Sequence, residues 1–197
     1  MPDVVQQPTK TMIVMGAPGA GKATLIGNLM YKCGGVDMIL LEKMRKAGIH
    51  KYDQVIGYCK EHAIKPSFEA RHATVLFIEE ATSANPPDYM IYVVDAATKK
   101  PPIESVGHDA RAASTIIVVN KMDACDWSEE SYNRALLTAI PHLDTDVGDY
   151  NSHATIPISA LNGDNVIETS TMCSWFSSES AKYKTLVEAI DIAAGFG

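Results

Sequence analysis

The stretch GAPGAGKAT, residues 16–24, decides the fold expected of this chain. It matches the phosphate-binding pattern G-x-x-x-x-G-K, with Gly16, Gly21 and Lys22 at the fixed positions. An apolar run precedes the stretch, and a helical pattern, KATLIGNLMY, overlaps its end. A loop between a strand and a helix directs backbone N–H groups and the positive end of the helix at an anion. The predicted phosphate-binding residues are Gly16, Ala17, Pro18, Gly19, Ala20, Gly21, Lys22, Ala23 and Thr24.

Ala23 is the one departure from this pattern, because a Ser or Thr normally follows the lysine and supplies a hydroxyl to magnesium. Thr24 does not replace that hydroxyl, since one helical step turns it away by about 100°. The loop therefore predicts phosphate binding without predicting tight magnesium binding. The alternative interpretation is a glycine-rich turn with Lys22 exposed to solvent.

Five short runs rich in Val and Ile predict buried strands, because they do not alternate with polar residues. The runs are MIVM (12–15), VLFI (75–78), MIYVV (90–94), TIIVV (115–119) and ATIPIS (154–159). Helical patterns separate them, so we expect an α/β fold. Its class is a Rossmann-like P-loop NTPase, a three-layer α/β/α sandwich with a mostly parallel sheet of about five strands.

Two later helices carry start signals. Asp126 and Glu129 have capping-box spacing ahead of one helix, and Thr185 and Glu188 have it ahead of another. The segment 48–74 contains one candidate helix, YDQVIGYCKEHA, and no convincing strand.

Composition and charge limit the kinds of partner that the chain can have. The chain has 197 residues, a formal net charge of −7 and no run of Lys and Arg, which argues against a nucleic-acid surface or an anionic membrane. No apolar stretch approaches the roughly 20 residues that span a bilayer, and the N-terminus lacks a signal-peptide pattern. The 4 cysteines form no C-x-x-C pair. We expect one cytoplasmic domain over residues 1–197 with reduced thiols and a flexible N-terminus at 1–9.

The base-recognition signal is NKMD, residues 120–123, at the end of the fourth predicted strand. The Asp123 carboxylate can accept two hydrogen bonds from the ring N1–H and the N2 amine of guanine, whereas adenine presents an acceptor there. The stem of Lys121 can lie over the flat base, and Asn120 can join the base to the phosphate loop. After the fifth strand, the Ala160 N–H can donate to guanine O6. The predicted guanine-binding residues are Asn120, Lys121, Asp123, Ser159, Ala160 and Leu161.

With these motifs the sequence resembles the G domain of the translation elongation factor 1-alpha and Tu family. The resemblance covers residues 10–47 and 88–193 and is faint between them. The matching segments are LMYKCGGVD (29–37), VVDA (93–96), IIVVNKMDA (116–124), IPISALNGDNVIE (156–168) and KTLVEAID (184–191). The resemblance implies a P-loop fold with GTP or GDP as the ligand, a magnesium cofactor held weakly, and a guanine nucleotide as the partner.

The chain also departs from that family. The family has a hydroxyl in place of Ala23, an effector-loop Thr not found around HAIKPSFE, and a D-x-x-G-H segment where this chain has VLFIEEATSANPPDY. The barrel domains with which the family grips tRNA are absent from the sequence. We therefore expect a reduced or engineered G domain. Its loop GAPGAGKAT also resembles that of adenylate kinases, where a small residue again replaces the hydroxyl.

Glu79 and Glu80 follow the second apolar run, as the acidic pair of many P-loop ATPases does. They are the predicted catalytic residues, one steadying magnesium through water (Glu79) and the other activating water. The alternative is a pair of solvated carboxylates at the end of a strand. Because phosphoryl transfer depends on the metal and on the missing γ-phosphate contacts, we expect GTP hydrolysis to be slow or absent and GDP to be preferred.

Two other functions stay open. One is an ATP-binding phosphotransferase or ATPase built on the adenylate-kinase-like loop, although the scattered arginines supply no lid cluster. The other is a folded module without nucleotide function. Calorimetry with GTP, GDP and ATP separates the three.

Overall fold

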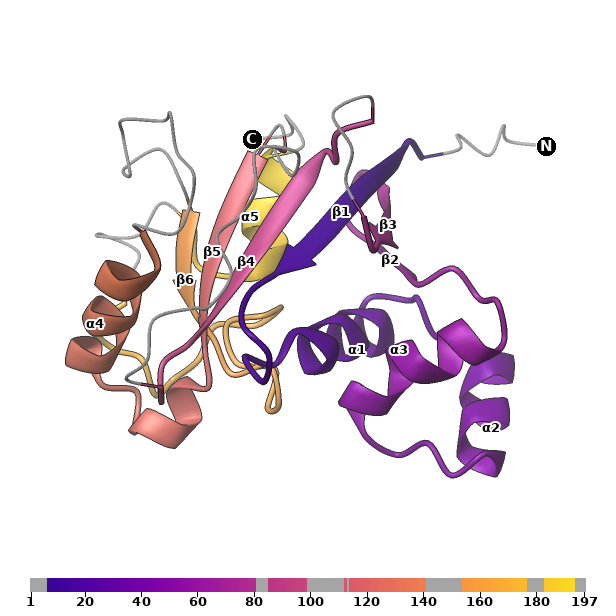
Figure 1. The fold of residues 1–197 in the computed structure, drawn as a ribbon, viewed down its shortest axis with the longest axis horizontal. Coiled ribbons are helices and arrows are strands. Elements are labelled where there is room, and N and C mark those ends of the chain that lie inside the picture. The colour runs from indigo at the N-terminus through magenta and orange to yellow at the C-terminus, as the bar shows by residue number, and fades with distance from the viewer. Residues whose placement is uncertain are drawn as a thin grey trace.

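A six-stranded sheet with the order β2-β3-β1-β4-β5-β6 forms the centre of the molecule in this computed structural model (Figure 1). The structure describes residues 7–80, 85–98, 112, 114–140, 154–176 and 183–193. The strands are β1 (Thr9–Met15), β2 (Ser67–Glu69), β3 (Thr74–Ile78), β4 (Tyr89–Asp95), β5 (Ser114–Asn120) and β6 (Ala154–Pro157).

All five strands expected from the apolar runs are present and run parallel to one another. The sixth, β2, pairs antiparallel with β3 at the edge and lies in the segment for which the sequence predicted no strand. The chain places β3 on one side of β1 and β4 on the other. The loop after β1 therefore lies where the strand order reverses, which is the usual ligand position in such sheets.

The helices are α1 (Lys22–Lys32), α2 (Met38–Lys46), α3 (Tyr52–Glu61), α4 (Glu129–Ala139) and α5 (Leu186–Ala193), with a short 3₁₀ helix, η2 (Met122–Cys125). Helix α5 starts as expected, with the Thr185 hydroxyl accepting from the Glu188 N–H at 3.2 Å. The expected cap of α4 was wrong: Ser128, not Asp126, occupies the N-cap and accepts from the Ser131 N–H. Asp126 instead has φ 48° and ends η2.

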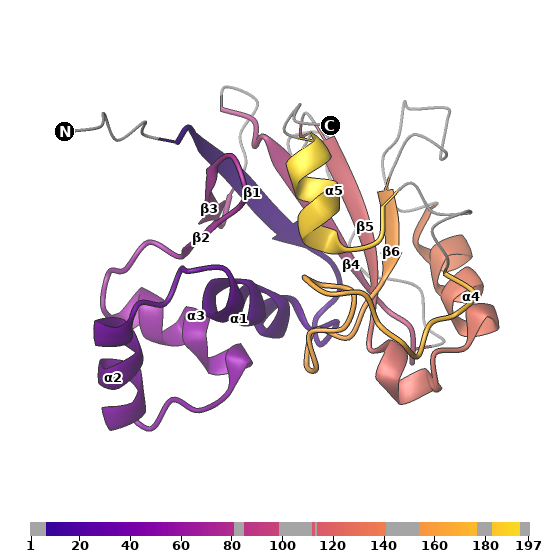
Figure 2. The same cartoon turned by 180° about the vertical axis from the view of Figure 1, so that it is seen from behind.

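Helices cover both faces of the sheet, which confirms the three-layer α/β/α class. Along β4 the buried side chains alternate between two core clusters, Ile91 and Val93 in one and Tyr92 and Val94 in the other. The first cluster includes side chains of α1, α2, α3 and α5, and the second those of α4. Figure 2 shows α5 across the sheet on the side opposite to α4.

Helices α1 and α3 pack closely because Gly27 faces the first residue of α3. A Cβ at Gly27 would overlap the Tyr52 carbonyl oxygen, so only glycine permits this approach. The Tyr31 and Tyr52 rings meet edge to face at 5.4 Å between centroids, an arrangement that adds to the packing. Helix α3 is thereby fixed beside the helix that follows the phosphate-loop motif.

Within the described part of the chain, no helix has the length and apolar character needed to cross a membrane. The four cysteines, Cys33, Cys59, Cys125 and Cys173, carry free thiols in this structure.

Candidate functional site

The loop after β1 has the backbone that the phosphate-binding motif requires. Gly16 and Gly21 have φ 133° and 98°, which is strained for any residue with a side chain. A Cβ at Gly16 would overlap the Val93 carbonyl oxygen, and one at Gly21 would overlap the Asn120 amide. Helix α1 begins at Lys22 with no side-chain cap, so the N–H groups of its first turn remain available to an anion.

Lys22 closes this loop from the helix side. Its ammonium donates to the carbonyl oxygens of Gly16 and Ala17, the latter at 3.0 Å. An ammonium has three donors, so one remains for a phosphate oxygen. Lys22 therefore both holds the shape of the loop and contributes charge to it.

Asn120 connects the two predicted binding loops. Its side-chain amide donates to the Ala20 carbonyl in the phosphate loop at 2.8 Å and accepts from the Ala160 N–H at 2.9 Å. Asn120 is only 2% exposed, and Ala20 and Ala160 are 1% exposed each. The structure thus brings the NKMD and SAL segments together with the phosphate loop. The Ala160 N–H expected to serve guanine O6 is already paired with Asn120, so O6 would be its second acceptor.

The rest of the NKMD segment turns sharply after β5. Lys121 has φ 64°, and its ammonium forms an ion pair with Asp95 at 2.7 Å. Asp95 ends β4 opposite Asn120, which places it at the base-recognition end of the site. Asp123 follows in η2 and is partly exposed. The ion pair anchors the head of Lys121, so its aliphatic stem is held beside this turn.

The SAL loop is held by its own hydrogen bonds. Ser159 donates its N–H to the Asp164 carbonyl at 3.1 Å, and its hydroxyl accepts from the Asn162 N–H at 3.2 Å. The buried Asn165 amide donates to the Pro157 carbonyl and accepts from the Ser170 N–H. Leu161 is 66% exposed at the tip.

Sequence reasoning missed Asn28, which links α1 to this loop. Its amide donates to the Ala160 carbonyl at 3.1 Å, and the side chain is fully buried. Its Oδ1 has no hydrogen-bond partner among the described residues. The available signal was a polar residue between Leu25 and Leu29 on the apolar face of α1. Ala160 is therefore held from two sides, by Asn28 and by Asn120.

On the other side of the phosphate loop lies a pocket of about 420 Å³. Apolar side chains of β1, α1, α3 and β3 form most of its wall, and the lining also includes Lys22, Ala23, Lys60 and Glu79. Cys59 lies in the wall, where burial raises the pKa of its thiol and so keeps it neutral. The Lys60 ammonium forms an ion pair with Glu79 at 2.8 Å.

These residues do not fit a magnesium ion held by the protein. The Ala23 methyl group offers no oxygen, and Glu79 already meets an ammonium of the same chain. Mg²⁺ requires oxygen ligands in near-octahedral geometry. Within the described residues, no group of three or more His, Cys, Asp or Glu side chains is arranged to hold a metal. Glu80 follows Glu79 and is exposed at the end of β3.

The fold and the loops define the class of protein as a P-loop G domain. Comparison with known proteins shows which proteins of this class the chain resembles. No protein-family model matches the sequence. The chain is similar to elongation factor 1-alpha of Aspergillus oryzae, at 29% identity over 224 aligned positions, and of Yarrowia lipolytica, at 30% over 226. Each match covers 91% of this chain and 48% of the relative, so the chain spans about half the length of these relatives.

Solved structures agree with this fold. The fold is similar to that of Sup35 complexed with GDP, with a TM-score of 0.68 and 24% identity over 96% of this chain and 46% of that one. It is also similar to the S. cerevisiae Ski7 GTPase-like domain bound to GTP, with a TM-score of 0.59 and 17% identity over 88% of this chain and 48% of that one. By sequence the chain is therefore similar to elongation factor 1-alpha over about half of that protein's length, which agrees with the resemblance that the motifs indicated.

Proposed function

We propose that this chain binds guanine nucleotides, GTP or GDP, in the site between the phosphate loop and the NKMD and SAL loops. The observation that carries the proposal is the buried Asn120 amide, which joins Ala20 to Ala160. One nucleotide can reach both loops because they are in contact. Lys22 and the first turn of α1 bind the phosphates, and Asp123 recognises the guanine edge.

The relatives support the choice of guanine. The two Sup35 structures are complexes with GDP and with GMPPNP, and the Ski7 domain was solved with GTP.

We further propose that hydrolysis of GTP is slow or absent and that GDP is preferred. Phosphoryl transfer depends on charge neutralisation at the γ-phosphate and on a positioned water. Ala23 lacks the hydroxyl that would hold magnesium, and the ion pair with Lys60 occupies Glu79, the carboxylate expected to steady the metal. Glu80 is the carboxylate that remains for a general base, and Glu80→Gln should abolish any phosphate release that the wild type shows.

Titration calorimetry with GDP, GTP and ATP tests the proposal. We expect binding of GDP and GTP and none of ATP. Asp123→Asn should weaken GDP binding about 10- to 100-fold, because it replaces one acceptor oxygen by an amino donor and removes the charge behind the other hydrogen bond, and it should shift preference to xanthosine diphosphate. Asp126→Asn is the matched control, since Asp126 is exposed on the same turn and its φ of 48° suits asparagine.

Unchanged GDP affinity in Asp123→Asn would remove this residue from the site. Binding of ATP in preference to GDP would favour the phosphotransferase alternative, and no binding of any nucleotide would contradict the proposal altogether.

A further inference from the structure

We propose that Lys60 takes the place of the divalent cation in this site, so that guanine nucleotides bind without magnesium. The inference rests on the guanine-nucleotide function proposed above and specifies how the phosphates are neutralised. It assigns a role to a residue outside every motif of the sequence.

The position of Lys60 is the first argument. It lies in the last turn of α3, and its ammonium contacts the Glu79 carboxylate at 2.8 Å. Lys60 and Glu79 line the same pocket as Lys22 and Ala23, the residues at the start of the phosphate-loop helix. The chain therefore places two ammonium groups and one carboxylate around the region where the sequence predicts the metal.

The helix that carries Lys60 is firmly placed. Gly27 allows α3 to lie directly on α1, and the Ile64 N–H donates to the Cys59 carbonyl at 2.9 Å as the chain leaves α3. Lys60 is thus presented by a packed helix beside the phosphate loop. Its own side chain is 64% exposed and free to reorient.

The surroundings disfavour a divalent ion. The pocket wall is formed mainly by apolar side chains such as Val14, Ile26 and Phe77, which offer no oxygen ligands. By contrast, an ammonium needs no octahedral ligand set, because it acts as a point charge with three rotatable donors.

The Lys60–Glu79 pair is suited to exchange. Both side chains are about two-thirds exposed, at 64% and 66%, and exposed pairs of this kind contribute little to stability. One Lys60 donor can remain on Glu79 while another turns to a phosphate oxygen. Lys60 then bridges a carboxylate and a phosphate, as a metal ion does in related sites.

The test is titration calorimetry with GDP, in excess MgCl₂ and in EDTA, on the wild type, on Lys60→Gln and on the variant that combines it with Glu79→Gln. Wild-type affinity should agree within about twofold between the two conditions. Lys60→Gln should weaken GDP binding in EDTA about tenfold, the value of one charge-assisted contact. In this variant MgCl₂ should restore little of the loss, because Ala23 and the apolar pocket wall still offer no oxygen ligands to a divalent ion. Lys60→Gln combined with Glu79→Gln should bind weakly in both conditions.

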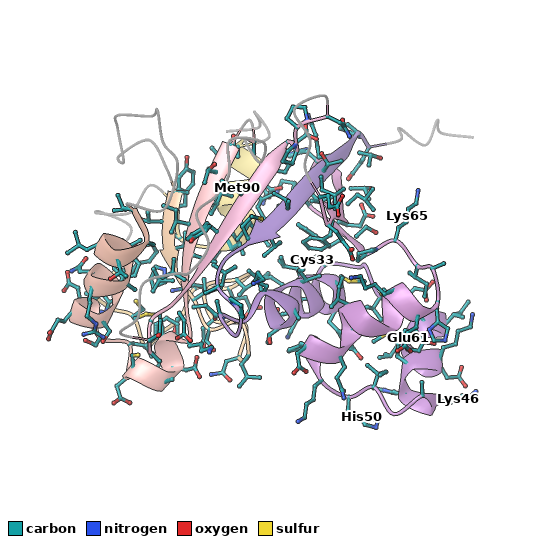
Figure 3. All side chains as sticks on the ribbon, viewed as in Figure 1. Cys33, Lys46, His50, Glu61, Lys65 and Met90 are labelled. Carbon is teal, nitrogen blue, oxygen red and sulfur yellow. The ribbon has the colours of Figure 1, made fainter. Side chains whose placement is uncertain are left out.

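Lys46→Gln is the matched control. Lys46 forms an ion pair with Glu42 at 2.7 Å on α2 that is slightly more exposed than the Lys60–Glu79 pair, and Figure 3 shows Lys46 at the outer end of the helical layer. This variant should bind GDP as the wild type does. Far-ultraviolet circular dichroism verifies that each variant is folded.

Two results overturn the inference while leaving the proposed function in place: wild-type binding that requires MgCl₂, or equal affinities for Lys60→Gln and Lys46→Gln in EDTA. Failure of GDP and GTP to bind under either condition overturns both proposals.

Discussion

Asn120→Ala tests whether one buried amide holds the two binding loops together. The substitution removes two hydrogen bonds, to the Ala20 carbonyl at 2.8 Å and from the Ala160 N–H at 2.9 Å. Both partners belong to residues only 1% exposed, so water does not readily replace the amide. A buried polar group left unpaired costs about 1–3 kcal/mol. Two such groups, allowing for some local relaxation, give a loss of about 2–4 kcal/mol in the free energy of unfolding.

Urea unfolding, followed by tryptophan fluorescence, measures this loss. Trp127 is buried just after η2, so its emission reports on the same region. With a urea dependence of about 2 kcal/mol per molar, the midpoint should fall by roughly 1–2 M. Asn162→Ala is the control, because Asn162 is an exposed residue of the SAL loop and its loss should change stability by less than about 0.5 kcal/mol.

Equal midpoints for Asn120→Ala and Asn162→Ala would refute the reasoning, because they would mean that the amide bridge contributes nothing measurable. A loss of nucleotide affinity without loss of stability would instead assign Asn120 to the ligand alone.

Gly27→Ala should destabilise the fold by about 1–3 kcal/mol, because the added methyl group would overlap the Tyr52 carbonyl. Gly57→Ala on α3 should instead stabilise the fold by about 0.5–1 kcal/mol, because its methyl group meets open space and alanine favours the helix. Thermal unfolding of the two variants measures both effects, and a shift of the same sign in both would contradict the packing argument. Burial alone would raise the pKa of the Asp88 carboxyl. Hydrogen bonds to this carboxylate, the first from the Thr11 N–H, lower its pKa by more, so the pKa of Asp88 in the folded protein lies below 3.8. Asp88 should therefore stabilise the fold above about pH 4 and lose this contribution as the pH falls through the folded pKa, so that the stability difference between wild type and Asp88→Asn narrows in acid. A difference independent of pH, measured by urea unfolding from about pH 6 to pH 3, would exclude this ionisation.

The sheet and the phosphate loop were predictable because their signals are local. Strands covered on both faces need continuous apolar runs, and a phosphate loop needs glycine where φ is positive, as at Gly16 and Gly21. The adjacency of the NKMD and SAL loops to the phosphate loop followed from the parallel order of the strands, since their carboxyl ends share one edge of the sheet.

The features that sequence reasoning missed depend on contacts between distant segments. Strand β2 has three residues, of which only Phe68 is buried, and it exists through pairing with β3. Helix α2 buries only Met44, whereas Met38 and Ile39 in its first turn are exposed, so its apolar residues do not show how it packs. The Lys60–Glu79 pair joins two elements whose spacing along the chain carries no regular signal.

At the start of α4, two candidate caps competed within three residues. Asp126 matched the expected spacing, but Ser128 has the extended backbone that an N-cap requires, with φ −66° and ψ 123°. Sequence spacing alone does not show which of two nearby residues caps a helix, because the N-cap position depends on the backbone path that η2 imposes before α4 begins.

The bridging amide of Asn120 also constrains how such a domain can change over evolutionary time. A substitution that reshapes the phosphate grip moves Ala20, and through Asn120 it moves Ala160 as well. In the proposed site, a change in the phosphate contacts is thus coupled to the contacts around the base through one side chain, while the choice of base depends on Asp123.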